Sequence, residues 1–241
     1  MFVAQTNLQL YKQLREHGFR KEDLRFIHRA YHFGVQLFPF LYRPNGKEHL
    51  AHGVGTASIL CSVQKKNSLI AAGLLHATYR HGEFPSLRTG PTKSNRTFVQ
   101  DALGRETEEH LVRYFHFDWD KQNLEELLSR FENLRPEDRD SLLIRLADCL
   151  EKCIDLGVLY SSPGKGSIQS LQKKGPIQVE LARRLGYPSL GNQLQIAQEA
   201  IFNSKIPSCL RKTNGAREDF TLVPLSARRK IVWWAFHRFF S

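Results

Sequence analysis

Three polar residues lie within apolar stretches of the sequence and together could form a metal site. His52 and His76 fall in segments rich in Leu, Ala and Gly, and Asp148 lies in the run LLIRLADCL. A buried imidazole or carboxylate lowers stability unless it is hydrogen-bonded or bound to an ion. Two neutral imidazoles and a carboxylate from separate helices suit a divalent metal ion. The residues alone leave open a second interpretation, in which ordinary hydrogen bonds satisfy each side chain.

The segments around these residues resemble the HD superfamily of metal-dependent phosphohydrolases. The matching text is AYHFG at 30–34, RPNGKEHLAH at 43–52, AAGLLHA at 71–77 and LLIRLADCLEK at 142–152. In order and spacing these segments are similar to the (p)ppGpp hydrolase domain of stringent-response enzymes, over about residues 21–160. The resemblance implies an HD-domain-like helical bundle in which His52, His76 and Asp148 bind Mn, Fe or Zn. The implied chemistry is attack of an activated water on phosphorus.

Several positions depart from that family. The aspartate that follows the second histidine is Ala77 here, and the acidic pair beyond it corresponds to Arg80 and His81. The asparagine that follows the LADRLH motif corresponds to Lys152. One implied metal ligand is therefore missing, and basic residues stand where the family has acids and an amide.

A second resemblance concerns the stretch AGLLHATYRHGEF at 72–84. It looks like a group of uncharacterised HD-like proteins with the pattern AGLLHxxYGxF. In that group Ala77 would be a normal feature, and Tyr79 would replace part of the lost chemistry. The alternative places Tyr79 in the core, with its hydroxyl on a backbone carbonyl.

Basic side chains supply the remaining candidates. Arg43 occupies the family position that contacts the nucleotide base, and with Lys47 and Tyr79 it completes our candidate catalytic set. Lys47 and Arg96 are expected in loops near the mouth of the site, where they could bind phosphate. The alternative for each cation is a solvated surface position. His49 and His81 are interpreted as surface histidines.

Composition narrows the class of protein. The 241 residues carry 35 Lys and Arg against 24 Asp and Glu, a net charge of +11. Such a charge favours an anionic partner, and we expect a phosphorylated small molecule, with nucleic acid as the less favoured partner. The alternative is a soluble enzyme that is basic only because the proteins of its source are generally basic.

No apolar run is long enough for a transmembrane helix, and the early charged residues argue against a signal peptide, so we expect a cytoplasmic protein. The four cysteines form no CxxC pair and are interpreted as reduced structural thiols.

The elements that must position these residues are predicted to be helices. Apolar residues recur at steps of three and four, and no window shows the sustained alternation of a strand, so the sequence predicts an all-α fold. The expected helices cover residues 5–17, 21–38, 50–63, 69–77, 97–116, 120–131, 138–160, 176–185, 190–203 and 227–240. The run LIAAGLLHA at 69–77 is predicted to be a central buried helix. Small residues in 53–58, including Gly53 and Gly55, would let another helix approach closely.

The chain is predicted to divide into two parts. Pro163, Gly164 and Gly166 mark a boundary between an HD-like domain at 1–162 and a helical C-terminal extension at 163–241 that packs on it. The basic, aromatic segment at 227–240 is expected to dock on the helical core, with an anionic membrane surface as the alternative.

Three functions remain open at this point. The leading hypothesis is an HD-fold, metal-dependent phosphohydrolase that acts on a nucleotide or another phosphorylated small molecule. The second is a degenerate HD domain that binds a ligand or protein without turnover, which the loss of the acids favours. The third is an iron-dependent HD-type oxygenase, ranked last because such oxygenases generally carry more ligands than this sequence offers.

Overall fold

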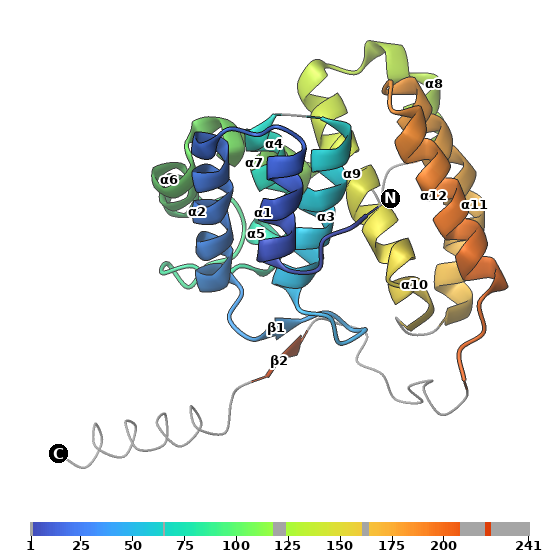
Figure 1. The fold of residues 1–241 in the computed structure, drawn as a ribbon, viewed down its shortest axis with the longest axis horizontal. Helices are drawn as coiled ribbons and strands as arrows, with labels where there is room; N and C mark the ends of the chain where they lie inside the picture. Colours follow the sequence, from blue (N-terminus) through green and yellow to red (C-terminus); the bar gives the residue numbers. More distant parts are fainter. Residues whose placement is uncertain (1, 65, 118–123, 161–163, 208–219, 223–241) are drawn as a thin grey trace.

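The described residues fold mostly as α-helices, which confirms the all-α expectation (Figure 1). The structure is a computed structural model that describes residues 2–64, 66–117, 124–160, 164–207 and 220–222. The first seven helices are α1 (Asn7–Glu16), α2 (Lys21–Leu37), α3 (His49–Val63), α4 (Asn67–Leu74), α5 (Thr78–His81), α6 (Lys93–Leu103) and α7 (Arg105–His116). They are followed by α8 (Leu124–Ser129), a 3-10 turn at Phe131–Asn133, α9 (Pro136–Ile154), α10 (Gly157–Tyr160), α11 (Gly164–Arg184) and α12 (Pro188–Asn203).

Helix α9 lies between two groups of helices and contacts both. Figure 1 shows α1–α7 on one side of it and the paired helices α11 and α12 on the other. Helix α9 packs against α3, α4 and α7, and also against α12. Leu142, Leu146 and Leu150 of α9 are fully buried in the hydrophobic core. A helix apolar on most of its circumference is a central element, and Asp148 is therefore carried into the interior of the molecule.

Helices α3 and α4 approach each other closely because α3 carries glycine at the crossing. A Cβ atom added to Gly53 would lie only 2.1 Å from the carbonyl oxygen of Leu74. A Cβ added to Gly55 would lie 2.7 Å from the Cγ of Glu151 on α9. The expected close approach at these small residues is confirmed. It brings His52, next to Gly53, towards His76, two residues beyond Leu74.

The central apolar helix ends earlier than expected. The prediction placed residues 69–77 in one helix, but α4 ends at Leu74 and α5 begins at Thr78. The last carbonyls of a helix have no partner within the helix. The carbonyl of Gly73 instead contacts the ring nitrogen Nδ1 of His76 at 2.8 Å. His76 therefore lies in a turn, where its ring can reach back to the helix end.

Other boundaries also differ from the predictions. Gly104, with a φ of +82°, divides the expected helix at 97–116 into α6 and α7. Leu156, with a φ of +55°, separates α9 from α10, so the expected helix at 138–160 is also two helices. Helix α11 begins at Gly164 rather than at 176 and contains Pro176. Its packing against α12 and α8 outweighs the local preference of glycine and proline to end a helix.

Two short strands, which the sequence pattern did not predict, join distant parts of the chain. The strands β1 (Leu41–Tyr42) and β2 (Phe220–Thr221) pair antiparallel, with Leu41 opposite Thr221. The backbone N–H of Leu222 extends this ladder to the carbonyl of Phe40 at 3.0 Å. The predicted segment at 227–240 and the predicted domain boundary at 162/163 lie outside the described residues.

Two further findings concern cysteines and membranes. The described cysteines, Cys61, Cys149 and Cys153, are free thiols, and burial raises the pKa of the Cys61 thiol to about 12. In the described part of the chain, no helix has both the length and the apolar character needed to cross a bilayer.

Candidate metal centre

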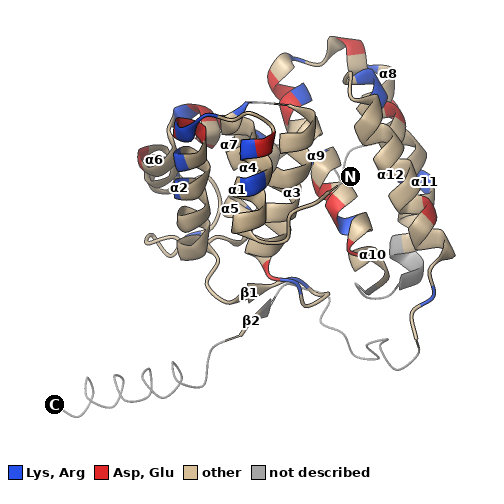
Figure 2. Ribbon diagram, in the orientation of Figure 1, with Lys and Arg blue, Asp and Glu red and all other residues tan. Residues whose placement is uncertain are grey.

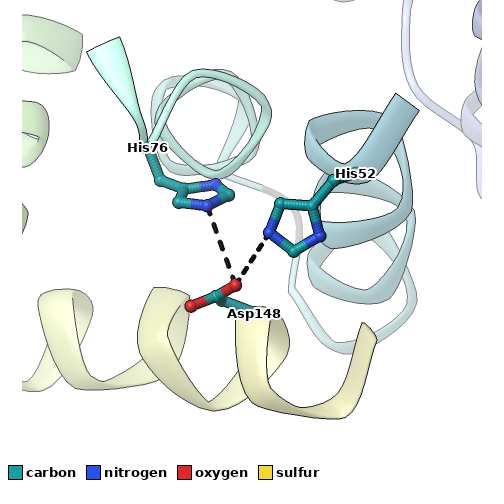
Figure 3. A group of neighbouring side chains, drawn as sticks. All are labelled: His52, His76 and Asp148. Carbon is teal, nitrogen blue, oxygen red and sulfur yellow. Dashed lines mark ion pairs between the residues drawn. The ribbon is translucent and has the colours of Figure 1, made fainter. Parts of the chain in front are cut away.

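His52, His76 and Asp148 converge from three elements onto one point (Figure 3). His52 comes from α3, His76 from the turn after α4, and Asp148 from α9. The Nε2 atom of His52 lies 2.8 Å from Oδ1 of Asp148, and the Nε2 atom of His76 lies 3.7 Å from the same oxygen. The three donor atoms all lie within 4.8 Å of one another. The structure thus brings together the three residues that the sequence singled out as metal ligands.

The outer nitrogen of each ring contacts an acceptor. Nδ1 of His52 contacts the carboxylate of Glu151, and Nδ1 of His76 contacts the carbonyl oxygen of Gly73. A neutral imidazole with its N–H on Nδ1 presents a lone pair at Nε2. Metal-binding histidines in proteins usually have this arrangement, with the other ring N–H on a carboxylate or carbonyl. Both rings are therefore oriented as metal ligands would be.

The inner atoms of the cluster have unfilled hydrogen-bonding capacity. Within the described residues, Nε2 of His52 and Oδ1 of Asp148 are buried and have no hydrogen-bond partner, although they lie 2.8 Å apart. Buried polar atoms are rarely left without a partner. A lone pair on Nε2 and a carboxylate oxygen at that distance repel each other unless a proton or a cation lies between them. The donor set and these two atoms fit a divalent metal ion.

The second oxygen of Asp148 faces cations instead. Its Oδ2 accepts hydrogen bonds from the ammonium group of Lys152 at 2.7 Å and the hydroxyl of Tyr114 at 3.1 Å. The guanidinium group of Arg145 lies 3.4 Å away and also stacks over the Tyr114 ring. Burial opposes ionisation of Asp148, but the positive charge of Lys152 and the neighbouring His52 outweigh it and hold the pKa of Asp148 well below its usual value. The carboxylate is therefore ionised, with Oδ1 turned towards the histidines.

Burial has the opposite effect on the neighbouring histidine. His76 is 9 % exposed, and desolvation lowers its pKa well below the ordinary value, against the attraction of Asp148. The ring is neutral at physiological pH and so keeps a lone pair for a ligand.

A small cavity of about 130 Å³ opens onto the cluster and is strongly cationic. His76, Asp148 and Ala77 line it, so no carboxylate occupies the position that the family resemblance assigns to an aspartate. Asp148 is the one acidic residue in the described lining, against four cations: Arg43, Arg80, Arg145 and Lys152. Arg43 thus lines the cavity, and Arg80 and Lys152 add positive charge to the lining. The cavity is suited to a small anionic group.

Lys47 and Tyr79, two of the other candidates, have partners outside the cationic cavity. Lys47 does not line this cavity, because its ammonium group contacts the carboxylates of Glu151 and, at 3.3 Å, Asp155. Tyr79 is buried and donates its hydroxyl to the Glu108 carboxylate at 2.8 Å, not to a backbone carbonyl or a ligand. Lys47 therefore contacts carboxylates rather than the cavity where it was expected to bind phosphate, and Tyr79 lies in the core, with a carboxylate rather than a backbone carbonyl as its partner.

Arg96 also differs from its prediction. It lies on α6 rather than in a loop, and its guanidinium group forms two bonds of 2.8 and 2.9 Å to the buried carboxylate of Glu108. Gln100 of the same helix donates to Glu108 as well, at 2.8 Å. Arg96 is thus held by a structural carboxylate away from the metal candidate.

His49 is not the surface residue that was expected. It is 5 % exposed because its ring packs between Phe38 and His81, with ring centroids 6.0 and 5.0 Å away. Both His49 and His81 line the cationic cavity.

Sequence reasoning missed Glu151, Arg145 and Tyr114. Glu151 and Arg145 lie three residues after and before Asp148 on α9, and residues at that spacing share one helix face. The helical spacing from Asp148 could therefore have predicted that both side chains lie near the site. Tyr114 comes from α7, and nothing in its local sequence connects it to Asp148.

Charge does not gather in one region of the residues that the structure describes. In Figure 2, Lys and Arg residues are spread over several helices and interleaved with Asp and Glu. The cationic cavity is therefore a local feature, and its position could not be inferred from the net charge of +11.

Part of the chain matches a known family model. Residues 42–118 match a family described as a domain of unknown function, DUF6817, over less than half of the chain. The matched stretch includes His52 and His76 but not α9 with Asp148. No curated protein matches the chain in sequence. The geometry of the site therefore carries the functional argument.

Proposed function

We propose that the protein is an HD-like, metal-dependent phosphohydrolase acting on a nucleotide or another phosphorylated small molecule. The observation that carries the proposal is the convergence of His52, His76 and Asp148, with two unpartnered buried atoms, at a cavity lined by four cations. A metal ion explains the unpartnered atoms, and the cations explain an anionic substrate. The resemblance to the HD superfamily supports the same chemistry.

Each residue has a defined part in this proposal. His52, His76 and Asp148 hold the ion, which when bound supplies Lewis-acid activation of water near neutral pH. Lys152 and Arg145 hold Oδ2 of Asp148 and so keep Oδ1 directed at the histidines. Arg43 and Arg80 have no ion-pair partner among the described residues and are available to bind phosphate oxygens with their planar guanidinium groups.

The absence of the family acids limits the substrates that we expect. Ala77 replaces one implied ligand, and Arg80 and His81 replace the acidic pair. We therefore expect no hydrolysis of (p)ppGpp, because that activity in the family depends on those acids. Binding of a phosphorylated ligand should persist, since the cations remain.

A specific observation favours a second candidate, a ligand-binding module without turnover. The ammonium group of Lys152 and the guanidinium group of Arg145 already neutralise Asp148 through Oδ2. Two nearby cations repel a divalent ion and could reduce its affinity. In this alternative the same cavity binds a phosphorylated ligand without chemistry.

Metal content separates the two candidates. We expect the protein, purified without chelators, to contain about one equivalent of Mn, Fe or Zn by elemental analysis. His52→Ala and His76→Ala should each lose that metal, because each removes one of the three proposed ligands. His32→Ala, at an exposed position on α2, should retain it.

Activity then completes the test. Wild-type protein should release phosphate or pyrophosphate from at least one compound in a panel of nucleotides and phosphate esters, and His76→Ala should not. A wild-type protein that binds no Mn²⁺, Fe²⁺ or Zn²⁺ on direct titration would overturn the metal site. A protein that is fully loaded but inactive on the whole panel would instead support the binding module. Turnover of ppGpp would show that the missing acids are dispensable.

A further inference from the structure

Glu151 is a buried carboxylate to which the proposed function gives no role. The residue is 1 % exposed on α9, one helical turn beyond Asp148. Its carboxylate contacts two groups of opposite character, the ring atom Nδ1 of His52 and the ammonium group of Lys47. A buried charge is costly unless it is paired, so these contacts account for its place in the interior.

The contact with His52 determines which ring nitrogen is free. A carboxylate accepts hydrogen bonds only, so it favours the tautomer with the proton on Nδ1. In that tautomer the Nε2 lone pair of His52 is directed at Oδ1 of Asp148, 2.8 Å away. The negative charge beside the ring also makes Nε2 a stronger donor to a cation.

Lys47 in turn fixes Glu151. Lys47 lies in the segment before α3. Its ammonium group also contacts Asp155 at 3.3 Å and the side-chain oxygen of Gln5 at 3.2 Å. Three acceptors around one ammonium hold it in place, although its side chain is 15 % exposed. Gly55 leaves the space that Glu151 occupies, since a Cβ there would lie 2.7 Å from the Cγ of Glu151.

We propose that Glu151 is the positioning residue of the metal centre, setting the tautomer and orientation of His52, and that Lys47 holds Glu151 for this task. The inference rests on the proposed metal site. It also assigns Lys47 a part in the site without contact with substrate. In the resembled family the motif LADRLHN has histidine at this position, so the pair is a feature of this chain.

Titration of metal-free protein with Zn²⁺, in competition with a chromophoric chelator, tests the role directly. Glu151→Gln retains the shape of the side chain and removes its charge. We expect it to weaken Zn²⁺ binding roughly 10–100-fold, the usual effect of losing such a partner of a ligand histidine. Lys47→Met should weaken binding by a smaller factor. Glu109→Gln is the matched control, because it makes the same change of charge at a surface carboxylate that pairs with Arg105, and it should bind Zn²⁺ as the wild type does.

A second readout does not depend on the metal. Nitrogen-15 NMR of the imidazole groups in metal-free protein should place the His52 proton on Nδ1 in the wild type. Glu151→Gln should shift the tautomer equilibrium, which a merely structural role would leave unchanged. If Glu151→Gln does not fold, the Zn²⁺ titration and the NMR measurement are both made on Lys47→Met instead.

The outcomes distinguish the two proposals. A wild type that does not bind Zn²⁺ would remove the metal site itself. A wild type that binds Zn²⁺ while Glu151→Gln binds it equally well, with an unchanged tautomer, would overturn the role of Glu151 and leave the metal site standing.

Discussion

Single residues were predictable where their type contradicted their surroundings. His52, His76 and Asp148 were identified because each interrupts an apolar segment, and a polar side chain in such a place needs a partner. Glu151 was missed because a charged residue on a helix is more often solvated. Its burial depends on Lys47, more than a hundred residues earlier in the chain. The contact between Tyr79 and Glu108 could not be predicted either, because Glu108 lies on another helix, 29 residues later in the chain.

Glu108 gives a residue-scale prediction about pH. Burial raises its pKa, but hydrogen bonds from Arg96, Gln100 and Tyr79 outweigh that effect, so the pKa of Glu108 lies below its ordinary value. A lowered pKa in the folded state adds stability that is fully present above the unfolded pKa, roughly 4.3, and is lost as the pH falls through the folded value. Glu108→Gln should therefore be less stable than the wild type at pH 7 and lose less stability between pH 5 and pH 3.

Urea denaturation across that pH range measures the effect. Glu109→Gln is the matched control, because Glu109 forms a surface pair with Arg105 and its side chain is 43 % exposed. Such pairs contribute little, and the control should follow the wild-type pH dependence. Identical acid profiles for the wild type and Glu108→Gln would contradict the prediction.

At the scale of elements, the existence of the helices was predictable and their ends were not. Apolar spacing located the cores of α1, α2, α3 and α12 closely, since that pattern reflects the buried face directly. The end of α4 at Leu74 could not be read from the sequence, because LIAAGLLHA is apolar on both sides of the break. No proline, asparagine or glycine stands at the break to mark the turn that contains His76.

The crossing of α3 and α4 gives an element-scale prediction. Replacing glycine by alanine inside a helix normally adds about 0.5–1 kcal/mol of stability. Gly53→Ala should instead destabilise the protein by about 3 kcal/mol, because its Cβ would meet the backbone oxygen of Leu74, which cannot move independently. Zn²⁺ affinity should fall as well, since the same crossing sets the separation of His52 and His76.

Gly34→Ala provides the comparison for this substitution. A Cβ at Gly34 would meet only the ends of the Leu50 and Leu75 side chains, at 2.8 and 2.9 Å, and these can rotate away. The loss in urea denaturation should be much smaller than for Gly53→Ala. Equal losses would show that the backbone contact at Leu74 is not the cause.

At the scale of the whole molecule, α9 joins the candidate site to the C-terminal helices. One face of α9 presents Asp148 to α3 and α4, and α12 packs against α9 as well. Local periodicity predicts that these helices exist but does not say which of them meet. That information lies in contacts between residues distant in the sequence.

Removing a buried side chain from α12 tests how strongly the two parts are joined. Leu194 is fully buried, and Leu194→Ala should lower the free energy of unfolding by about 2–5 kcal/mol. We expect circular dichroism to show one unfolding transition at a lower urea concentration. Ile196→Ala, at a position 59 % exposed, should change stability little. Two separate transitions in the Leu194→Ala variant would show that the parts unfold independently.

The small ladder between β1 and β2 imposes an order on folding during synthesis. Leu41 leaves the ribosome long before its partner Thr221, so the ladder closes only after the residues between them have been made. Contacts between such distant residues form slowly, because the intervening chain must first be ordered. The segment that carries Arg43 directly follows β1, and before the ladder closes it is held by local bonds such as that from the Arg43 N–H to the Lys47 carbonyl at 2.8 Å. With only two paired residues, the ladder is also among the first places to open in native-state hydrogen exchange. Arg43 lines the cationic cavity, so we expect this stretch of its lining to be among the first to exchange.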